Sequence, residues 1–205
     1  MYKYSFESTT DDALMLRNAL EQQSNVEKES QIEDYSNLIV RKPWGYEYLI
    51  FENDEIALWM LHIARKRGTS THCHPNKTTN LILLSGQLTC EGLNWSKNLK
   101  PLDFVRIDRG VFHSSRAVSS ENIYPPSENG SFLIEIESPV AKGDLVRAKD
   151  SYGRSGKSYE GIESMLEYTK DMLLIPEKTQ DWNDWKHKLF NLDFCIKTGR
   201  DIRGK

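Results

Sequence analysis

Short apolar runs separated by turn-prone residues are the dominant pattern in the middle of the chain. Between residues 38 and 140 these runs are rich in Val, Ile, Leu, Tyr and Phe, and pieces such as ENDE, LSGQ and DRG divide them. We expect strands at residues 46–51, 56–64, 80–84, 87–91, 104–107 and 131–136. Many short strands joined by tight turns, with no long helical period between them, predict a mainly β antiparallel sandwich or small barrel.

A helical pattern precedes the strands. Thr10 can cap a helix whose first turn carries Asp11 and Asp12, because negative charge is favourable at the positive end of the helix dipole. Ala13, Leu16 and Leu20 then recur on one face, so we predict a helix over residues 10–24. The polar stretch 24–36 is either a second exposed helix or a loosely held linker.

A second helical pattern follows the strands. The apolar residues recur at helical spacing and Pro176 ends the first helix, while Asp181 caps another. The apolar positions are Ile162, Met165, Leu166, Met172 and Leu173 in the first helix, and Trp182, Trp185 and Leu189 in the second. The sequence therefore divides into an N-terminal helical arm (1–39), a β-barrel (40–155) and C-terminal helices (156–205).

Composition and charge exclude several classes of protein. The 205 residues include 27 basic and 30 acidic side chains, and the resulting net charge of −3 lacks the basic excess of nucleic-acid-binding proteins. We see no apolar stretch long enough for an export signal or a membrane span. The three cysteines, Cys73, Cys90 and Cys195, stand at unrelated spacings and suggest reduced thiols. We therefore expect a cytoplasmic protein with neither nucleic-acid nor membrane partners.

Histidines carry the strongest chemical signal. His72 and His74 are two residues apart, and on a strand such residues project from the same face about 7 Å apart. His113 follows Gly110 after another predicted strand. Three histidines that converge inside a small barrel would form an open site for a divalent ion such as Zn, Fe, Mn or Ni.

The spacing of these histidines resembles the two motifs of the cupin superfamily. The first motif reads Gly68-x3-His72-x-His74-x4-Thr79-x6-Gly86, and the second reads Leu102-x5-Asp108-x-Gly110-x2-His113. The resemblance implies a cupin fold, which is a double-stranded β-helix or jelly-roll barrel, with His72, His74 and His113 as metal ligands. Thr79 stands where the family has a metal-binding Glu, and Asp108 and Leu102 replace the second motif's Pro and first Gly.

The segments that flank the motifs narrow the resemblance. Residues 42–47, KPWGYE, and residues 134–154, which include DLVR and YGR, are similar to segments that bracket the cupin domain of type II mannose-6-phosphate isomerases. That resemblance implies a metal-dependent isomerase acting on a sugar phosphate or nucleotide-linked sugar. Such a reaction needs a metal, a general base and cations for the phosphate. The candidate contacts are Arg147, Lys142 and Arg154, with Arg65, Lys66 and Arg67 before the first motif.

The missing carboxylate at Thr79 leaves room for other assignments. Glu135 and Glu137 on a late strand can supply a replacement, and Glu91 is a weaker candidate. Strand alternation directs Cys73 away from the two histidines, toward a core. His62, in an apolar strand, is expected to be a buried neutral residue, and His187 a surface residue.

Three functions remain open at this stage. The leading one is the isomerase-like enzyme, with Arg147, Glu135 and Lys142 as candidate catalytic residues. A three-histidine Fe(II) dioxygenase is favoured by the missing Glu, and a non-catalytic sugar-binding module is the third possibility. Each would act on a small molecule, and apolar stripes on the terminal helices are compatible with a homodimer.

Overall fold

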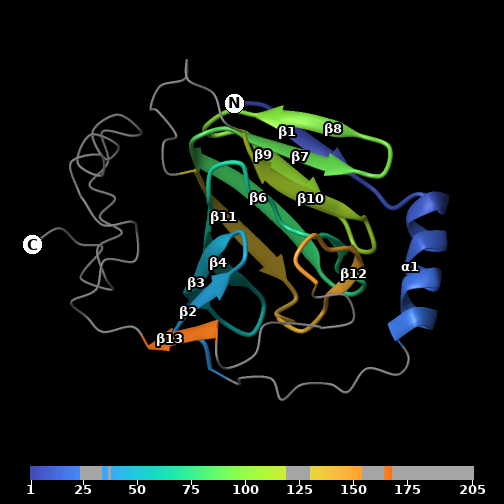
Figure 1. The fold of residues 1–205 in the computed structure, drawn as a ribbon, viewed down its shortest axis with the longest axis horizontal. Helices are drawn as coiled ribbons and strands as arrows, with labels where there is room; N and C mark the ends of the chain where they lie inside the picture. Colours follow the sequence, from blue (N-terminus) through green and yellow to red (C-terminus); the bar gives the residue numbers. More distant parts are fainter. Residues whose placement is uncertain (24–33, 37, 119–129, 154–163, 168–205) are drawn as a thin grey trace, which may run out of the picture.

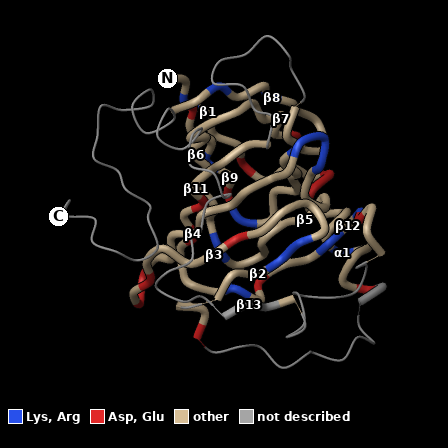
Figure 2. The backbone as a smooth tube through the Cα atoms, turned by 60° about the vertical axis from the view of Figure 1, so that its left-hand side comes forward, with Lys and Arg blue, Asp and Glu red and all other residues tan. Residues whose placement is uncertain are grey.

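The computed structural model describes residues 1–23, 34–36, 38–118, 130–153 and 164–167. These residues form two β-sheets that face each other and one helix, α1 (Thr10–Gln23), which lies against the outside of the smaller sheet (Figure 1). Within the described residues, no helix is both long and apolar enough to cross a membrane. Lys, Arg, Asp and Glu are interspersed along the described backbone (Figure 2).

The larger sheet has eight strands. Its neighbouring strands pair antiparallel, except that the N-terminal strand pairs in parallel with its neighbour at one edge. In spatial order the strands are β1 (Lys3–Phe6), β9 (Phe104–Ile107), β6 (Thr78–Ser85), β11 (Ser131–Ser138), β4 (Ala57–Ile63), β3 (Gly45–Glu52), β2 (Leu38–Lys42) and β13 (Met165–Glu167).

The smaller sheet has five antiparallel strands. In spatial order they are β12 (Val146–Lys149), β5 (Thr71–Cys73), β10 (His113–Ala117), β7 (Leu88–Gly92) and β8 (Ser96–Leu99). From β4 to β12 the chain crosses between the two sheets at every connection except β7–β8. This alternating path winds the two sheets into a double-stranded β-helix, so the predicted cupin-type barrel is confirmed.

Strand alternation sorts the side chains onto two faces of each sheet. The inner faces form the main core, in which Trp59, Leu61 and Leu133 of the larger sheet meet Leu88 and Cys90 of the smaller one. A second apolar cluster lies on the outer face of the larger sheet. The inner faces of β5, β10, β11 and β12 continue past the apolar core into polar residues, and these residues form the site described below.

The predicted N-terminal helix is confirmed, but its buried face and its cap differ from the prediction. Ala13 and Leu20 are exposed, whereas Asp12 and Ala19 are buried. The cap is Thr9, because its hydroxyl accepts a bond from the Asp12 backbone N–H and the Asp12 carboxylate accepts one from the Thr9 N–H. Asp12 faces the barrel because its other carboxylate oxygen accepts a bond from the Phe112 N–H at 2.9 Å.

The six predicted strands are all present, with ends that differ by a residue or two. The prediction gave no ranges for β2, β5, β8, β10 and β12, and it missed β1, which adds residues of the predicted arm to the edge of the larger sheet. The helical prediction is wrong for Met165 and Leu166, which form β13. The unpaired edge of β2 offers them backbone hydrogen bonds, and a short apolar run does not by itself distinguish a strand from a helix. The rest of the predicted C-terminal helices, in 156–163 and 168–205, lies outside the described residues.

Candidate metal centre

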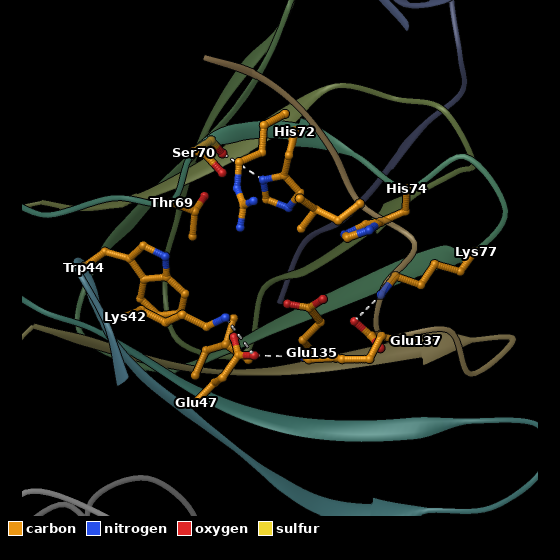
Figure 3. Close-up of a pocket in the computed structure, with 14 residues that line it drawn as sticks. Lys42, Trp44, Glu47, Thr69, Ser70, His72, His74, Lys77, Glu135 and Glu137 are labelled. Atoms are coloured by element: carbon orange, nitrogen blue, oxygen red, sulfur yellow. Dashed lines mark hydrogen bonds and ion pairs between the residues drawn. The ribbon is translucent and has the colours of Figure 1, made fainter. Parts of the chain in front are cut away.

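A polar pocket opens between the two sheets at one end of the barrel (Figure 3). Its space of about 450 Å³ includes part that is open to solvent. The lining residues are Lys42, Trp44, Glu47, Leu61, Thr69, Ser70, His72, His74, Lys77, Glu135, Glu137, Lys142, Leu145 and Arg147. Most of these side chains are charged or polar, so the pocket suits an ionic small molecule.

Three histidines come together at this pocket from neighbouring strands. His72 and His113 are directly paired across β5 and β10, and His74 follows His72 on the same face. One ring nitrogen from each histidine lies within 4.8 Å of the others. His74 and His113 are almost fully buried, and His72 is half-buried at the pocket surface. The structure therefore brings together all three predicted ligands, which we call the histidine cluster.

Backbone carbonyls fix the orientation of each imidazole ring. The Nδ1 atoms of His72, His74 and His113 bond to carbonyl oxygens at 2.8, 2.5 and 3.0 Å. A carbonyl only accepts, so each Nδ1 carries the proton and each Nε2 carries a lone pair. In metalloproteins this outer contact sets the tautomer and aims the coordinating nitrogen.

The electrostatic surroundings keep these rings neutral. Burial lowers the pKa of His72 and of His74 well below the ordinary value, and it lowers the pKa of His113 to about 4. The neighbouring Lys77 ammonium lowers all three pKa values further. Neutral imidazole is the form that binds a metal, so protons compete weakly for these nitrogens at neutral pH.

The residues present fit a divalent metal ion. The Nε2 atom of His74 is buried and has no hydrogen-bond partner within the described residues. A buried acceptor without a partner is costly unless something occupies it. Three aligned imidazole donors form the open type of site that Zn, Fe, Ni and Mn occupy in enzymes.

The segment after β11 also holds the histidine cluster in place. The Asp144 backbone carbonyl accepts the bond from His74, while its carboxylate accepts bonds from the N–H groups of Asn76 and Lys77 at 2.7 and 3.1 Å. Behind the strands, Cys73, Phe112 and Val146 pack against Ala19 of α1. Cys73 thus points away from the histidines into an apolar contact, as predicted.

Two glutamates extend from β11 into the pocket, on the side below His72 and His74 (Figure 3). Burial and the nearby Glu137 carboxylate raise the pKa of Glu135 to about 8. Burial also acts to raise the pKa of Glu137, but the ammonium groups of Lys142 and Lys77 lower it below the ordinary value overall. Lys77 Nζ lies 2.5 Å from Glu137 Oε1, and both side chains are almost fully buried. The two carboxyls therefore differ in charge at neutral pH.

A second group of charged side chains, centred on Glu47, lines the same pocket and acts on the pKa of Glu135. Glu47 on β3 receives Lys142 Nζ at 2.9 Å and Lys42 Nζ at 3.4 Å. Lys142 Nζ also lies 3.3 Å from the centre of the Trp59 ring, a cation–π contact. Burial acts to lower the pKa of Lys142, but the surrounding carboxylates, Glu47 foremost, raise it overall. We call Lys42, Glu47, Lys77, Glu135, Glu137 and Lys142 the charged cluster.

The predicted contact residues divide into two sets. Arg147, Glu135 and Lys142 line the pocket, and Arg147 is buried beside His72 across the β5–β12 pair. Other candidates do not take part. Arg65, Lys66 and Arg67 form an exposed turn, and Glu91 is exposed on β7. His62 is buried on the opposite face of β4, against Tyr46 and Phe132. Arg154 and His187 lie outside the described residues.

Several pocket residues were not singled out from the sequence. Lys42, Trp44 and Glu47 all come from the KPWGYE segment, which the isomerase resemblance marked without assigning any role to these residues. Lys77 lies inside the first motif, between His74 and Thr79, and looks like a surface charge in the sequence. Their positions within the KPWGYE segment and the first motif were the features of the sequence that could have identified these residues as part of the site.

Comparisons with known proteins found no family model and no curated protein that matches the chain. Solved structures do resemble it. KdgF from Halomonas sp. is 16% identical with a TM-score of 0.45, over 55% of this chain and 96% of that chain. A double-stranded β-helix protein from Klebsiella pneumoniae is 18% identical with a TM-score of 0.44, over 60% of this chain and 100% of that one. An RmlC-like cupin from Shewanella frigidimarina is 15% identical with a TM-score of 0.40, over 58% and 88%. The fold assignment rests on the strand order described above and not on these scores.

Proposed function

We propose that this chain is a metal-dependent enzyme that transfers a proton on an anionic sugar, either a sugar phosphate or a nucleotide-linked sugar. One observation carries the proposal. One ring nitrogen from each member of the histidine cluster lies within 4.8 Å of the others, and His72 and His74 line the same pocket as Glu135, whose pKa is raised to about 8. A metal site next to a carboxyl group that titrates near neutrality is suited to acid–base catalysis.

His72, His74 and His113 would hold the divalent ion. The chemistry that such an ion supplies when bound is polarisation of a carbonyl or hydroxyl oxygen of the substrate, which makes the neighbouring C–H bond more acidic. The histidines themselves do not exchange protons in this scheme, because backbone carbonyls occupy each Nδ1.

Glu135 is the acid–base residue in this proposal. It projects into the pocket from β11, while the metal ligands belong to the opposite sheet. In its ionised form, which is the minor form at neutral pH and predominates above pH 8, the carboxylate accepts a proton from one substrate carbon and returns it to the neighbouring carbon, which is an aldose–ketose isomerisation. A raised pKa makes the carboxylate a stronger base than an ordinary glutamate.

The cations of the pocket explain the preference for an anionic substrate. Lys42, Lys77, Lys142 and Arg147 face three carboxyl groups, and Glu135 is mainly protonated at neutral pH. The pocket therefore carries excess positive charge even without a metal ion. Charged hydrogen bonds from Lys and Arg are the usual means of holding a phosphate group.

Metal content is the first test of this proposal. Elemental analysis of purified, tag-free protein should find near-stoichiometric Zn, Fe, Mn or Ni in wild type and background levels in His74→Ala. Glu91→Gln, which changes an exposed carboxylate on β7, is the matched control and should keep the metal. A wild-type chain without metal after anaerobic reconstitution would contradict the enzyme proposal and favour the non-catalytic sugar-binding module.

Proton transfer is the second test. The metal-loaded protein is incubated in D2O with mannose 6-phosphate, fructose 6-phosphate and a nucleotide-linked sugar panel, and NMR follows deuterium incorporation next to the carbonyl group. Exchange that requires both His74 and Glu135 supports the proposal. Failure to exchange on any anionic sugar, with metal bound, contradicts it.

A three-histidine Fe(II) dioxygenase is a second candidate, favoured by one observation. The histidine cluster is the only group of three or more potential ligands found in the described residues, and it contains no carboxylate. Oxygen consumption by the Fe(II)-loaded chain, without deuterium exchange on sugars, would favour this function. A sugar-binding module would show neither activity and would still bind the sugar.

A further inference from the structure

A mostly apolar surface crosses the outer face of the larger sheet, away from the pocket. Residues that pair across neighbouring strands share a face of the sheet, so the backbone register defines rows of adjacent side chains. One row is Ile39, Tyr48, Met60, Ile134 and Ile82, and the row beside it is Tyr46, His62 and Phe132. We call these residues, with Leu84 of β6, the outer patch.

The centre of the outer patch is buried. Met60 is 0% exposed, Tyr48 is 3% exposed and His62 is 7% exposed. Side chains stand roughly perpendicular to a sheet, so neighbours on the same face lie beside one another and do not cover each other's tips. A side chain in the middle of an open face therefore keeps contact with solvent. The low exposure means that some part of the protein lies over the outer patch.

No element of the described chain supplies this cover. The apolar side chains that pack together in the outer patch all belong to strands of the larger sheet. The helix α1 packs against β12 of the smaller sheet, and β13 extends the larger sheet at its edge beside β2 (Figure 1). The structure contains a single chain. The cover therefore comes from residues of this chain outside the described ranges.

The hydroxyl group of Tyr46 is a second sign of a cover. It is buried and has no hydrogen-bond partner within the described residues. Burial also raises the pKa of Tyr46 above its ordinary value. On an open face this hydroxyl would bond to water, whereas a buried hydroxyl calls for a polar partner from the chain that covers it.

Composition identifies which segment provides the cover. The undescribed ranges 24–33, 119–129 and 154–163 are short and polar, and each contains only two apolar or aromatic residues. Residues 168–205 are instead rich in Leu, Ile, Phe and Trp. Their stripe of Trp182, Trp185 and Leu189 recurs at helical spacing and needs an apolar surface to pack against.

The described chain also delivers this segment to the outer patch. β13 ends at Glu167, which pairs with Leu38 next to Ile39 at the edge of the patch. Crossing from β2 to β6 spans four strand spacings of about 4.8 Å, or roughly 20 Å. An α-helix of roughly 14 residues has this length, so residues 168–205 are long enough to cross the patch.

We propose that the outer patch is a docking surface for residues 168–205 of the same chain, with the stripe of Trp182, Trp185 and Leu189 against it. The occupant is a segment of the same chain and not a second copy, because the patch is already buried in a single chain. The inference does not depend on the proposed function, since the outer patch and the pocket lie on opposite faces of the larger sheet.

Hydroxyl-radical footprinting of the full chain tests this docking. Mass spectrometry measures the oxidation rate of Met60 and, as an internal standard on the same strand, of Trp59, which is buried on the inner face. In the triple variant Trp182→Ser, Trp185→Ser and Leu189→Ser, Met60 should be oxidised several-fold faster than in wild type, while Trp59 should stay protected. Asn183→Ser with Lys186→Ser, which changes polar residues of the same segment, is the matched control and should behave as wild type.

A crosslinking experiment on the wild-type chain covers the case in which the triple variant does not fold. Cys195 lies within the proposed docking segment, whereas Cys73 and Cys90 are buried and burial raises the pKa of each to about 12. A thiol-reactive photo-crosslinker should therefore attach to Cys195 at neutral pH. After illumination, crosslinks within one chain to peptides of β3, β4 or β11 support the proposal. Crosslinks between two chains, or only to peptides of the smaller sheet, overturn it.

Dilution separates the proposed occupant from a second copy of the chain. Wild-type Met60 should be oxidised at the same slow rate at every protein concentration, because the cover belongs to its own chain. Protection that is lost on dilution, together with a change from dimer to monomer mass, would assign the outer patch to a second copy and overturn the proposal. Fast oxidation of wild-type Met60 at all concentrations, or an unchanged rate in the folded triple variant, would overturn it as well.

Discussion

The histidine cluster and the charged cluster face the same pocket, but different interactions hold them in place. Each histidine is oriented by a backbone carbonyl, and its own neutrality removes any need for a counter-charge. The members of the charged cluster instead hold one another through buried ion pairs, such as Lys77–Glu137 and Lys142–Glu47. The first cluster is therefore set by the barrel backbone, whereas the second depends on every one of its members.

The difference has a functional consequence. A site fixed by backbone can hold an ion in constant geometry while substrate enters and leaves. A cluster of mutually paired charges can exchange partners, because an anionic substrate competes with Glu47 and Glu137 for the same lysines. We expect any substitution in the histidine cluster to impair metal binding strongly. Substitutions in the charged cluster should change the affinity for an anionic substrate, and the pKa values of the remaining members, by smaller amounts.

The largest expected effect comes from removing two members of the histidine cluster. In His72→Ala with His113→Ala, metal content should fall from about one ion per chain to background while the chain stays folded, because a single remaining imidazole cannot hold a divalent ion. Elemental analysis and circular dichroism measure the two properties. His62→Gln, on the opposite face of β4, is the control and should keep its metal. Stoichiometric metal in the folded double variant would refute the assignment of these ligands.

The sequence predicted the histidine cluster because two local regularities were sufficient. Strand alternation placed His72 and His74 on one face, and the second motif placed His113 on a nearby strand. The charged cluster could not be found in this way. Lys42 on β2, Glu47 on β3 and Lys77 just before β6 look like solvated charges in the sequence, and only the order of these strands in the larger sheet brings them to one pocket.

The same limit explains the errors in the fold. The helix over residues 10–23 was predictable from its charges and period, but its buried face depends on the Asp12 bond to Phe112, 100 residues away. Met165 and Leu166 pair with the distant strand β2, which no local pattern reveals. In both regions the outcome depends on hydrogen bonds to distant residues. The central strands, in contrast, could be predicted from the local pattern of apolar runs and turns.

The second largest effect is expected from replacing Glu135, the proposed acid–base residue. Glu135→Gln should lower the rate of substrate deuterium exchange by about 10²- to 10⁴-fold, the typical contribution of a general acid–base group. Metal content should be unchanged, because Glu135 is not among the proposed ligands. The exchange rate is measured by NMR on samples of metal-loaded protein and substrate quenched at successive times, with Glu91→Gln as the control. An unchanged rate would remove Glu135 from the mechanism.

A smaller effect concerns the titration of Glu135 in metal-free protein. Its pKa is raised to about 8 by burial first and by the Glu137 carboxylate second. The carboxyl should therefore stay protonated through neutral pH and ionise near pH 8, and Glu137→Gln should move this ionisation to lower pH because one of its causes is gone. Carbon-13 NMR of Glu-labelled chain resolves the titration. A Glu135 that titrates near the ordinary value of 4.5 in wild type would show that neither burial nor the Glu137 carboxylate controls its pKa, and would contradict its role as a base active near neutral pH.

The smallest expected effect tests the backbone support of the histidine cluster. Asp144→Ala keeps the carbonyl that orients His74 but removes the carboxylate that accepts bonds from the Asn76 and Lys77 N–H groups. The turn after His74 then loses its two hydrogen bonds to the segment that carries this carbonyl. Zn(II) affinity should fall by about tenfold, at the lower end of the cost of losing outer support for a ligand. Asp54→Ala, in the exposed β3–β4 turn, is the control, and competition with a chromophoric chelator measures both affinities. If both variants bind Zn(II) equally, the backbone carbonyl of residue 144 holds His74 without help from the Asp144 carboxylate, and the backbone origin of this cluster is confirmed.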